Sequence, residues 1–418
     1  MTQLSQLAET LTGSEIVKLG NEIKVRVGQG EKIYNYTIGD FDPQIFPIPI
    51  ELKEAIIKAY QNNYTSYPPA EGLLELRHSV ASFIEDQFGL HYNANELLIA
   101  AGGRPLIYAL FRTVVGPGDK VIYAVPSWNN NHYAHINGGV HCVIEALPEN
   151  NFMPTAEEIA PHLADASLLC LCTPQNPTGT THSKASLEQI CDMVLAENKR
   201  RSPEQRKLYV MFDQMYSTLT YGECKHYNPV SLRPEMKDYT ISIDGISKAF
   251  AATGVRVGWA MGPAHVISKM KALLVHMGGW SPIAEQKATA EFLGNKEAIE
   301  KFHKHFKSEL EKRLVLIYNG INALKQKGFP VDAIEPQASI YLTIKFDLKG
   351  LKAGENTLAN QQEVADYILK TAHLAVVPFY AFGADRQSPW YRLSVGTCKI
   401  EEIPEMLMVL EEALTALH

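Results

Sequence analysis

Five short and almost uninterrupted apolar runs, each ending in a polar loop, constrain this chain more than any other feature of its sequence. They span residues 97–101, 121–125, 168–172, 208–212 and 240–244. Strands that are apolar at nearly every position are buried on both faces, and stretches with helical periodicity separate these runs. The pattern predicts an α/β fold built on a mostly parallel sheet. Because ligands bind beyond the carboxyl ends of such strands, we expect the loops that follow the runs to converge.

The loop after the fifth run carries Lys248, in the segment from Ser247 to Trp259. A lysine between a strand and a turn can bind an aldehyde cofactor as an imine once its amine has lost its proton. Partial burial or nearby positive charge lowers the pKa of a lysine in this way, and Arg256 can supply that charge while binding a cofactor phosphate. Most lysines are solvated surface residues, so this hypothesis requires matching groups in the other loops.

The loops after the third and fourth runs carry groups that pyridoxal phosphate requires. Asp213 directly follows the fourth run, and a buried carboxylate there would keep a pyridine nitrogen protonated. Tyr216 and Asn176 are placed to reach the phenolic oxygen of the cofactor. Each residue has an ordinary alternative role in a turn or a loop cap, but their joint presence favours a pyridoxal-phosphate enzyme.

The loops after the first two runs offer contacts for a phosphate and a ring. Gly102 and Gly103 let the backbone approach a phosphate at the start of an expected helix over 105–115, where free amides and the helix dipole favour an anion. Trp128 provides a flat face for stacking on a planar ring, although an aromatic residue at a strand end is core about as often.

Taken together, these segments resemble the class I and II pyridoxal-phosphate aminotransferases of fold type I, nearest to the aspartate and aromatic amino-acid members. The resemblance extends from about Gly39 to Arg392 and implies a seven-stranded sheet in the large domain. It rests on the segment from Ser247 to Trp259, on Asn176-Pro177-Thr178-Gly179, on Asp213 with Tyr216, and on Arg392.

The resemblance also implies a role for each residue of the cofactor site. Lys248 would bind the cofactor and shuttle the proton, with Asp213 at the pyridine nitrogen and Asn176 and Tyr216 at the phenolic oxygen. The cofactor phosphate and ring would be held by Gly102, Gly103, Arg104, Arg256 and Trp128.

Other residues would complete the substrate side and the dimer. Arg392 would bind the substrate α-carboxylate, because a guanidinium fork suits a planar carboxylate, with Gly39 and Asn176 beside it. Tyr67 would cross the interface of a homodimer to reach the phosphate of the other subunit, so the active sites would be shared.

The reaction that the resemblance implies is a ping-pong transamination between an L-amino acid, aspartate or aromatic, and a 2-oxo acid such as 2-oxoglutarate. A lyase of the same fold, of the β-eliminating or cyclopropane-forming type, stays open as an alternative, since it would need no acceptor. A non-catalytic pyridoxal-phosphate-binding regulator is a third hypothesis. Such proteins usually carry a DNA-binding domain, for which the segment before Gly39 is too short.

Four positions depart from the family pattern and bear on the substrate. Gly245 stands where a phosphate-binding serine is common, Gln214 where an acidic residue is usual, and Ala338 and Phe379 where glycines are common. An aromatic substrate would need apolar walls, such as Ile340, Tyr341 or Phe379. A dicarboxylate would need a second cation in the pocket, and the sequence alone identifies no residue for that role.

The order of the elements suggests two domains. Residues 49–291 carry the alternating strands and helices of a large domain, and residues 1–48 with 292–418 form a smaller α/β domain. Helical periodicity over 284–324, 361–371 and 403–417 and strands over 339–346 and 391–395 belong to this second half.

Composition and charge argue against nucleic acid, a membrane or a metal ion as a partner of this chain. The net charge of −7 over 418 residues does not favour binding to nucleic acid, which is itself negatively charged. The sequence contains no apolar run of about eighteen residues, so it predicts no membrane span. Six cysteines without metal-ligand spacing predict buried thiols in a reducing compartment and no metal site. We therefore expect a cytoplasmic enzyme.

Overall fold

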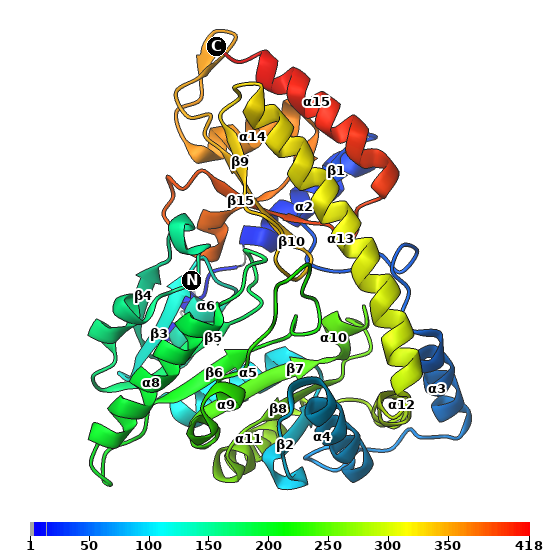
Figure 1. Cartoon of the computed structure of the whole chain (residues 1–418), viewed down its shortest axis with the longest axis vertical. Helices are drawn as coiled ribbons and strands as arrows, with labels where there is room; N and C mark the ends of the chain where they lie inside the picture. The colour runs from blue at the N-terminus through cyan, green and yellow to red at the C-terminus, as the bar shows by residue number, and fades with distance from the viewer. Residues whose placement is uncertain (1–3, 14) are drawn as a thin grey trace.

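The computed structural model describes residues 4–13 and 15–418. Within these residues, a seven-stranded sheet has the strand order β2-β8-β7-β6-β5-β3-β4 (Figure 1). Strand β8 is antiparallel to both of its neighbours, and the other neighbouring pairs are parallel. The predicted α/β fold with a mostly parallel sheet is confirmed. The strands are β2 (Leu97–Ala100), β3 (Lys120–Val125), β4 (Val140–Glu145), β5 (Ala166–Cys172), β6 (Tyr209–Asp213), β7 (Thr240–Gly245) and β8 (Gly258–Met261).

Helices cover both faces of this sheet, which explains why its central strands are apolar at almost every position. Each face has its own hydrophobic core. One core includes α5 (Gly103–Val114) and α11 (Ala264–Met277). The other includes α3 (Ile50–Gln61), α4 (Leu74–Phe88), α8 (Lys184–Arg200) and α12 (Ile283–Leu293).

A third core lies in the upper part of Figure 1, around a four-stranded sheet of order β14-β15-β10-β9. The N-terminal segment joins this part, because β1 pairs in parallel with β13. The 31-residue helix α13 runs along both parts of the molecule. The elements are β1 (Tyr34–Asn35), β9 (Val331–Ala333), β10 (Tyr341–Phe346), β13 (Leu374–Ala375), β14 (Val377–Pro378), β15 (Trp390–Ser394), α13 (Lys296–Gln326), α14 (Gln361–Thr371) and α15 (Ile403–Thr415).

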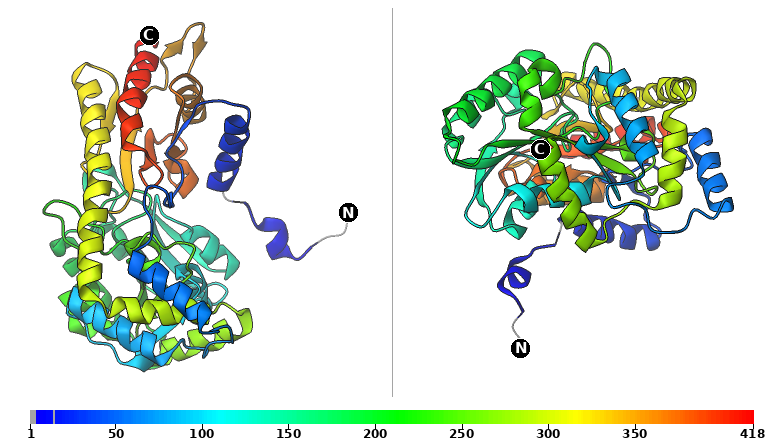
Figure 2. Two further views of the ribbon diagram at one scale, coloured as in Figure 1. Left: turned by 90° about the vertical axis from the view of Figure 1, so that its right-hand side faces the viewer. Right: turned by 90° about the horizontal axis from the view of Figure 1, so that it is seen from below.

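The remaining elements are short or peripheral. Helices α1 and α2 lie beside the body of the molecule (Figure 2). Residues 1–3 and 14, which fall in the expected small-domain segment 1–48, lie outside the described residues. None of the helices within 4–13 and 15–418 has the length and apolar character needed to cross a membrane. These elements are α1 (Gln6–Thr10), α2 (Glu15–Gly28), α6 (Asn130–Ile136), α7 (Ala156–Ile159), α9 (Pro229–Leu232), α10 (Ile246–Ala249), β11 (Lys352–Ala353) and β12 (Asn356–Thr357).

The helical periodicity over 284–324 belongs to two helices, not one. Helix α12 ends at Leu293, and α13 begins at Lys296. Between them the side chain of Asn295 accepts a hydrogen bond from the backbone N–H of Ala298, at 3.1 Å. An asparagine that caps a helix start in this way favours a new helix over continuation of the old one. The expected domain boundary at residue 291 falls inside α12.

Two strands of the large sheet were not among the five apolar runs. Strand β4 lies at the edge of the sheet, where Val140 and Val143 are exposed, so its pattern lacks a continuous buried run. Strand β8 is only four residues long and begins with Gly258, which carries no side chain, so it presents a shorter apolar run than the other central strands.

Glycines let three backbone segments, around Gly102, Gly245 and Gly258, pass unusually close together. A Cβ on Gly245 would lie 2.8 Å from the Cα of Gly258, and a Cβ on Gly258 would lie 2.7 Å from the carbonyl carbon of Gly102. A serine at position 245 would therefore collide with strand β8. The departure from the family pattern at this position is a packing requirement of this chain.

We expect Gly258→Ala to lower the free energy of unfolding by about 2 kcal/mol, because the new methyl group would meet backbone atoms that cannot rotate away. Urea denaturation followed by circular dichroism measures this loss. Gly254→Ala is the matched control, since a Cβ at Gly254 would have no atom within 4 Å. Equal midpoints for the two variants would contradict the packing argument.

Candidate active site

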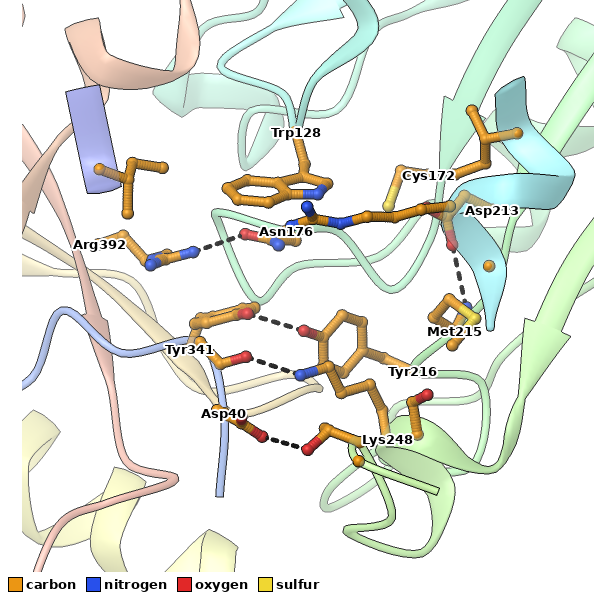
Figure 3. Close-up of a pocket in the computed structure, with 18 of the residues that line it drawn as sticks. Asp40, Trp128, Cys172, Asn176, Asp213, Met215, Tyr216, Lys248, Tyr341 and Arg392 are labelled. Atoms are coloured by element: carbon orange, nitrogen blue, oxygen red, sulfur yellow. Dashed lines mark hydrogen bonds between the residues drawn. The ribbon is translucent and has the colours of Figure 1, made fainter. Parts of the chain in front are cut away.

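The loops after the apolar strands converge on one cavity of about 590 Å³. It lies where the carboxyl ends of the large sheet face the smaller part of the molecule, and Figure 3 shows ten of its residues by name. Ten predicted site residues line it: Gly39, Gly103, Arg104, Trp128, Asn176, Asp213, Tyr216, Lys248, Arg256 and Arg392. Two others do not line it, Gly102 and Tyr67.

Lys248 lies on the short helix α10, which follows strand β7. Its Nζ donates a hydrogen bond to the backbone carbonyl of Gly39 at 2.6 Å (Figure 3). Burial lowers the pKa of Lys248 to about 8, with smaller contributions from Arg392, Arg104 and Arg256, whereas Asp40 raises it. Arg256 was expected to lower this pKa, but desolvation is the larger cause. At neutral pH about a tenth of this amine is therefore the reactive free base, a far larger fraction than in an ordinary lysine.

Asp213 ends strand β6 and points into the cavity. Its Oδ1 accepts a hydrogen bond from the backbone N–H of Met215 at 3.2 Å, and no cation pairs with it among the described residues. Burial raises the pKa of Asp213 to about 6. A carboxylate in such a place lacks a positive partner, so it suits a ligand that brings a protonated ring nitrogen.

Arg392 lies on strand β15 and is only 1% exposed. Its guanidinium donates to Asn176 Oδ1 at 3.0 Å and to the Thr37 carbonyl at 2.7 Å, and it stacks over the ring of Tyr341. Its Nε has no hydrogen-bond partner and no carboxylate pairs with it among the described residues. A buried cation without a counter-ion is costly, and this one is open to a carboxylate that enters the cavity.

An anion site lies at the start of α5. The φ of Gly102 is +87°, a conformation that glycine adopts freely. A Cβ there would collide with the guanidinium of Arg256, which is held by the carbonyls of Thr253 and Ala101 at 2.6 Å each. Free amides at the start of a helix and a nearby arginine suit a phosphate. Ser247 also lines the cavity.

The residues present fit pyridoxal phosphate on these observations. A cavity lined by an unpaired carboxylate, an anion site and a reactive amine matches a phosphorylated aldehyde with a basic ring. Trp128 supplies an aromatic face, and the Cζ atom of Arg104 lies 5.3 Å from the centre of its ring.

Several residues of the cavity were not expected from the sequence, and Tyr341 was expected only as an apolar wall. Tyr341 accepts or donates a hydrogen bond with Tyr216 between their hydroxyl oxygens, 2.7 Å apart. A Cβ on Gly39 would lie 2.7 Å from the Tyr341 hydroxyl, so a side chain there would displace it. Strand alternation places Tyr341 and Thr343 on one face of β10, which is the signal that would have found Tyr341. The other additions are Ile16, Asp40, Ile107, Cys172, Met215, Ser247, Thr253 and Gly254.

The walls of the cavity differ from those expected for an aromatic substrate. Tyr341 is part of the lining, but Ile340 and Phe379 are buried and are not among the lining residues. The ring of Phe379 packs against Phe152, with ring centres 5.0 Å apart. Ala338 is also buried, and its backbone N–H donates to the Gly179 carbonyl.

Comparison with known proteins gives one consistent family. The model of aminotransferase class I and II matches residues 32–410. An aspartate aminotransferase of Bacillus sp. (strain YM-2) is 30% identical over 91% of this chain and 92% of its own length. An aspartate/prephenate aminotransferase of Thermus thermophilus is 30% identical over 93% of this chain and 94% of its own.

Solved structures agree with these relatives. The crystal structure of an aspartate aminotransferase from Rhizobium meliloti has a TM-score of 0.91 at 25% identity and covers all of both chains. The aspartate aminotransferase from Thermus thermophilus with maleate has a TM-score of 0.87 at 27% identity, covering 99% of this chain and all of that one.

We expect the rate at which Lys248 captures added pyridoxal phosphate in the apoprotein to rise with pH and to level off above about pH 8. The pKa of Lys248 is lowered, so its neutral, nucleophilic form predominates above about 8, whereas an ordinary lysine would titrate near 10.5. Stopped-flow absorbance of the imine measures the rate, and Lys248→Ala should give no such signal. A rate that still climbs steeply above about pH 9 would count against the lowered pKa.

Proposed function

Because this chain belongs to the aminotransferase class I and II family and is a pyridoxal-phosphate-dependent aminotransferase, we propose that it takes the amino group from a dicarboxylic amino acid, aspartate first. The acceptor is a 2-oxo acid such as 2-oxoglutarate, in a ping-pong reaction. The family and fold predicted from the sequence are confirmed. The relatives reported above are aminotransferases, and none of them supports the lyase or regulator alternatives.

The observation that carries this substrate class is the charge of the cavity. Four cations line it, Lys248, Arg256, Arg392 and Arg104, against two carboxylates. Lys248 serves the cofactor, Arg256 the phosphate and Arg392 the α-carboxylate, so the side chain of Arg104 is left for a second carboxylate. Among the described residues, no carboxylate pairs with Arg104. The Thermus relative of known structure was solved with maleate, a dicarboxylate.

The backbone N–H and the guanidinium of Arg104 can bind two different ligand groups. Its backbone N–H lies in the first turn of α5, where it can contribute to the phosphate site expected from the sequence. Its guanidinium instead lies over the ring of Trp128, and both residues line the cavity. The cofactor role predicted for Arg104 is therefore compatible with a substrate role for its side chain.

The bound cofactor supplies a carbonyl for the amino group and a ring that withdraws electrons from the substrate Cα. The residues of this chain do the rest. The Nζ of Lys248 would hold the cofactor carbonyl and, as a free amine, would take and return the Cα proton of the substrate. Asp213 would hold the ring nitrogen in its protonated form, and Asn176 and Tyr216 would hold the phenolic oxygen. Arg392 fixes the α-carboxylate in the direction that presents the Cα–H bond to Lys248.

A homodimer is part of the proposal. Tyr67 is 85% exposed and does not line the cavity of its own chain, which suits a residue that serves a second copy. Helix α3 carries an apolar patch of Ile50, Ile57 and Tyr60, which are each about half exposed and which helical spacing places on one face. An exposed apolar surface of this kind marks a protein interface.

We further propose the domain division and the location expected from the sequence. Residues 49–291 as one domain and 1–48 with 292–418 as another are supported by the separate hydrophobic core around the four-stranded sheet. A cytoplasmic location is supported by the free cysteines of the described residues, three of which are buried.

We expect Arg104→Met to lower kcat/KM for aspartate by about a hundredfold and to leave kcat/KM for phenylalanine nearly unchanged, because one charge-assisted pair is lost with the first donor only. A panel of amino donors with 2-oxoglutarate gives both values. The dissociation constant of pyridoxal phosphate is measured in parallel, because a side chain bound to the phosphate would raise it. A wild-type preference for aromatic donors would overturn the proposed substrate class.

We expect sedimentation to give twice the mass of one chain, and Ile57→Asp to shift it to the monomer by placing a charge in the apolar patch. Val315→Asp on α13, where Val315 is 39% exposed, is the control and should stay dimeric. A wild-type monomer at micromolar concentration would contradict the shared site.

A further inference from the structure

A second carboxylate is buried directly behind the cofactor loops. Asp244, near the end of β7, is 2% exposed. Its Oδ2 accepts hydrogen bonds from Gln214 Nε2 and Ser217 Oγ, both at 3.0 Å, and its Oδ1 accepts one from the Gly245 backbone N–H at 2.7 Å. No cation pairs with it among the described residues. Burying an unpaired carboxylate is costly, so its presence at this depth calls for a reason.

Two of the three donors belong to one turn that carries cofactor residues, and the third is Gly245, the last residue of β7. Gln214 and Ser217 lie in the turn that begins at Asp213 and includes Tyr216. Gly245 precedes α10, the helix that bears Lys248. One carboxylate therefore connects the turn of the ring-nitrogen partner with the helix of the reactive amine.

Gln214 can present only its amino group to Asp244. Its Oε1 accepts a hydrogen bond from Asn228 Nδ2 at 2.7 Å and lies 3.4 Å from His226 Nε2. Burial lowers the pKa of His226 to about 3, so the ring is neutral. With Oε1 engaged by Asn228, the amide NH₂ faces position 244, which must then offer an acceptor. The Oδ2 atom of Asp244 meets this requirement.

We propose that Asp244 is a positioning residue for the cofactor site, which holds the Asp213–Tyr216 turn in place against Lys248 through Gln214, Ser217 and Gly245. The proposal rests on the family's cofactor and not on the substrate class proposed above. It also explains why position 214 carries glutamine where an acidic residue is usual in the family. A carboxylate at position 214 would repel the buried carboxylate of Asp244 and could not donate the hydrogen bond that Gln214 donates.

The test is the dissociation constant of pyridoxal phosphate, measured by absorbance titration of the apoprotein. Asp244→Asn is expected to raise it at least about tenfold, because an amide placed against the Gln214 amide leaves a buried donor without an acceptor. The double variant Gln214→Glu with Asp244→Asn exchanges donor and acceptor across the same bond. It is expected to bind within about twofold of the wild type.

Ser242→Ala is the matched control on the same strand. Ser242 is fully buried and accepts from Asn228 Nδ2 at 3.2 Å, but among the described residues it makes no hydrogen bond to Asp244. Its loss is expected to lower the unfolding midpoint and to leave cofactor affinity unchanged, as a purely structural role would. If the Asp244→Asn protein does not fold, the affinity of the double variant for pyridoxal phosphate is the test. A double variant that folds and binds the cofactor as tightly as the wild type supports the proposal.

Two results would overturn the proposal. One is an Asp244→Asn protein that binds pyridoxal phosphate as tightly as the wild type. The other is a folded double variant that binds about tenfold more weakly than the wild type. A wild-type chain that bound no pyridoxal phosphate would overturn the cofactor itself, which separates that failure from the first two.

Discussion

The site depends on Arg392, a fully buried guanidinium without a carboxylate partner among the described residues. It lies on the small sheet, donates to Asn176 in a loop of the large sheet, and donates to the carbonyl of Thr37 in the N-terminal segment. These bonds and the ring of Tyr341 offset part of the cost of burying the charge. One side chain therefore joins three separate segments and leaves its Nε free for an anion.

Desolvation shifts the pKa values of two ionisable groups of this cavity in opposite directions. It lowers the pKa of Lys248 to about 8 and raises the pKa of Asp213 to about 6. Both shifts favour the neutral form in the protein without ligand, so the amine becomes nucleophilic and the carboxyl group becomes sensitive to any positive charge that arrives. Asp244 adds a further buried acid behind them, and burial raises its pKa to about 7.

The sequence predicted much of the fold and the site because both depend on local patterns. The five apolar strands, helix α14 over Gln361–Thr371 and the loops that carry Lys248, Asp213 and Asn176 are where they were expected. The break at Asn295 was missed because the apolar periodicity continues across it. Strand β4 was missed because an edge strand need not be apolar, and Tyr341 was expected only as an apolar wall because its hydroxyl partner, Tyr216, is 125 residues away.

The sequence by itself determined the chemistry of this protein, since the residue types at strand ends and the order of the strands bring a lysine, an aspartate and an asparagine to one edge of a sheet. Only the tertiary structure decided how these groups behave. It buried Arg392, left Arg104 free over Trp128, and closed the gap between Gly245, Gly258 and Gly102 so that a serine cannot fit. Burial, pKa values and close backbone contacts arise from segments far apart in the chain, and no local pattern records them.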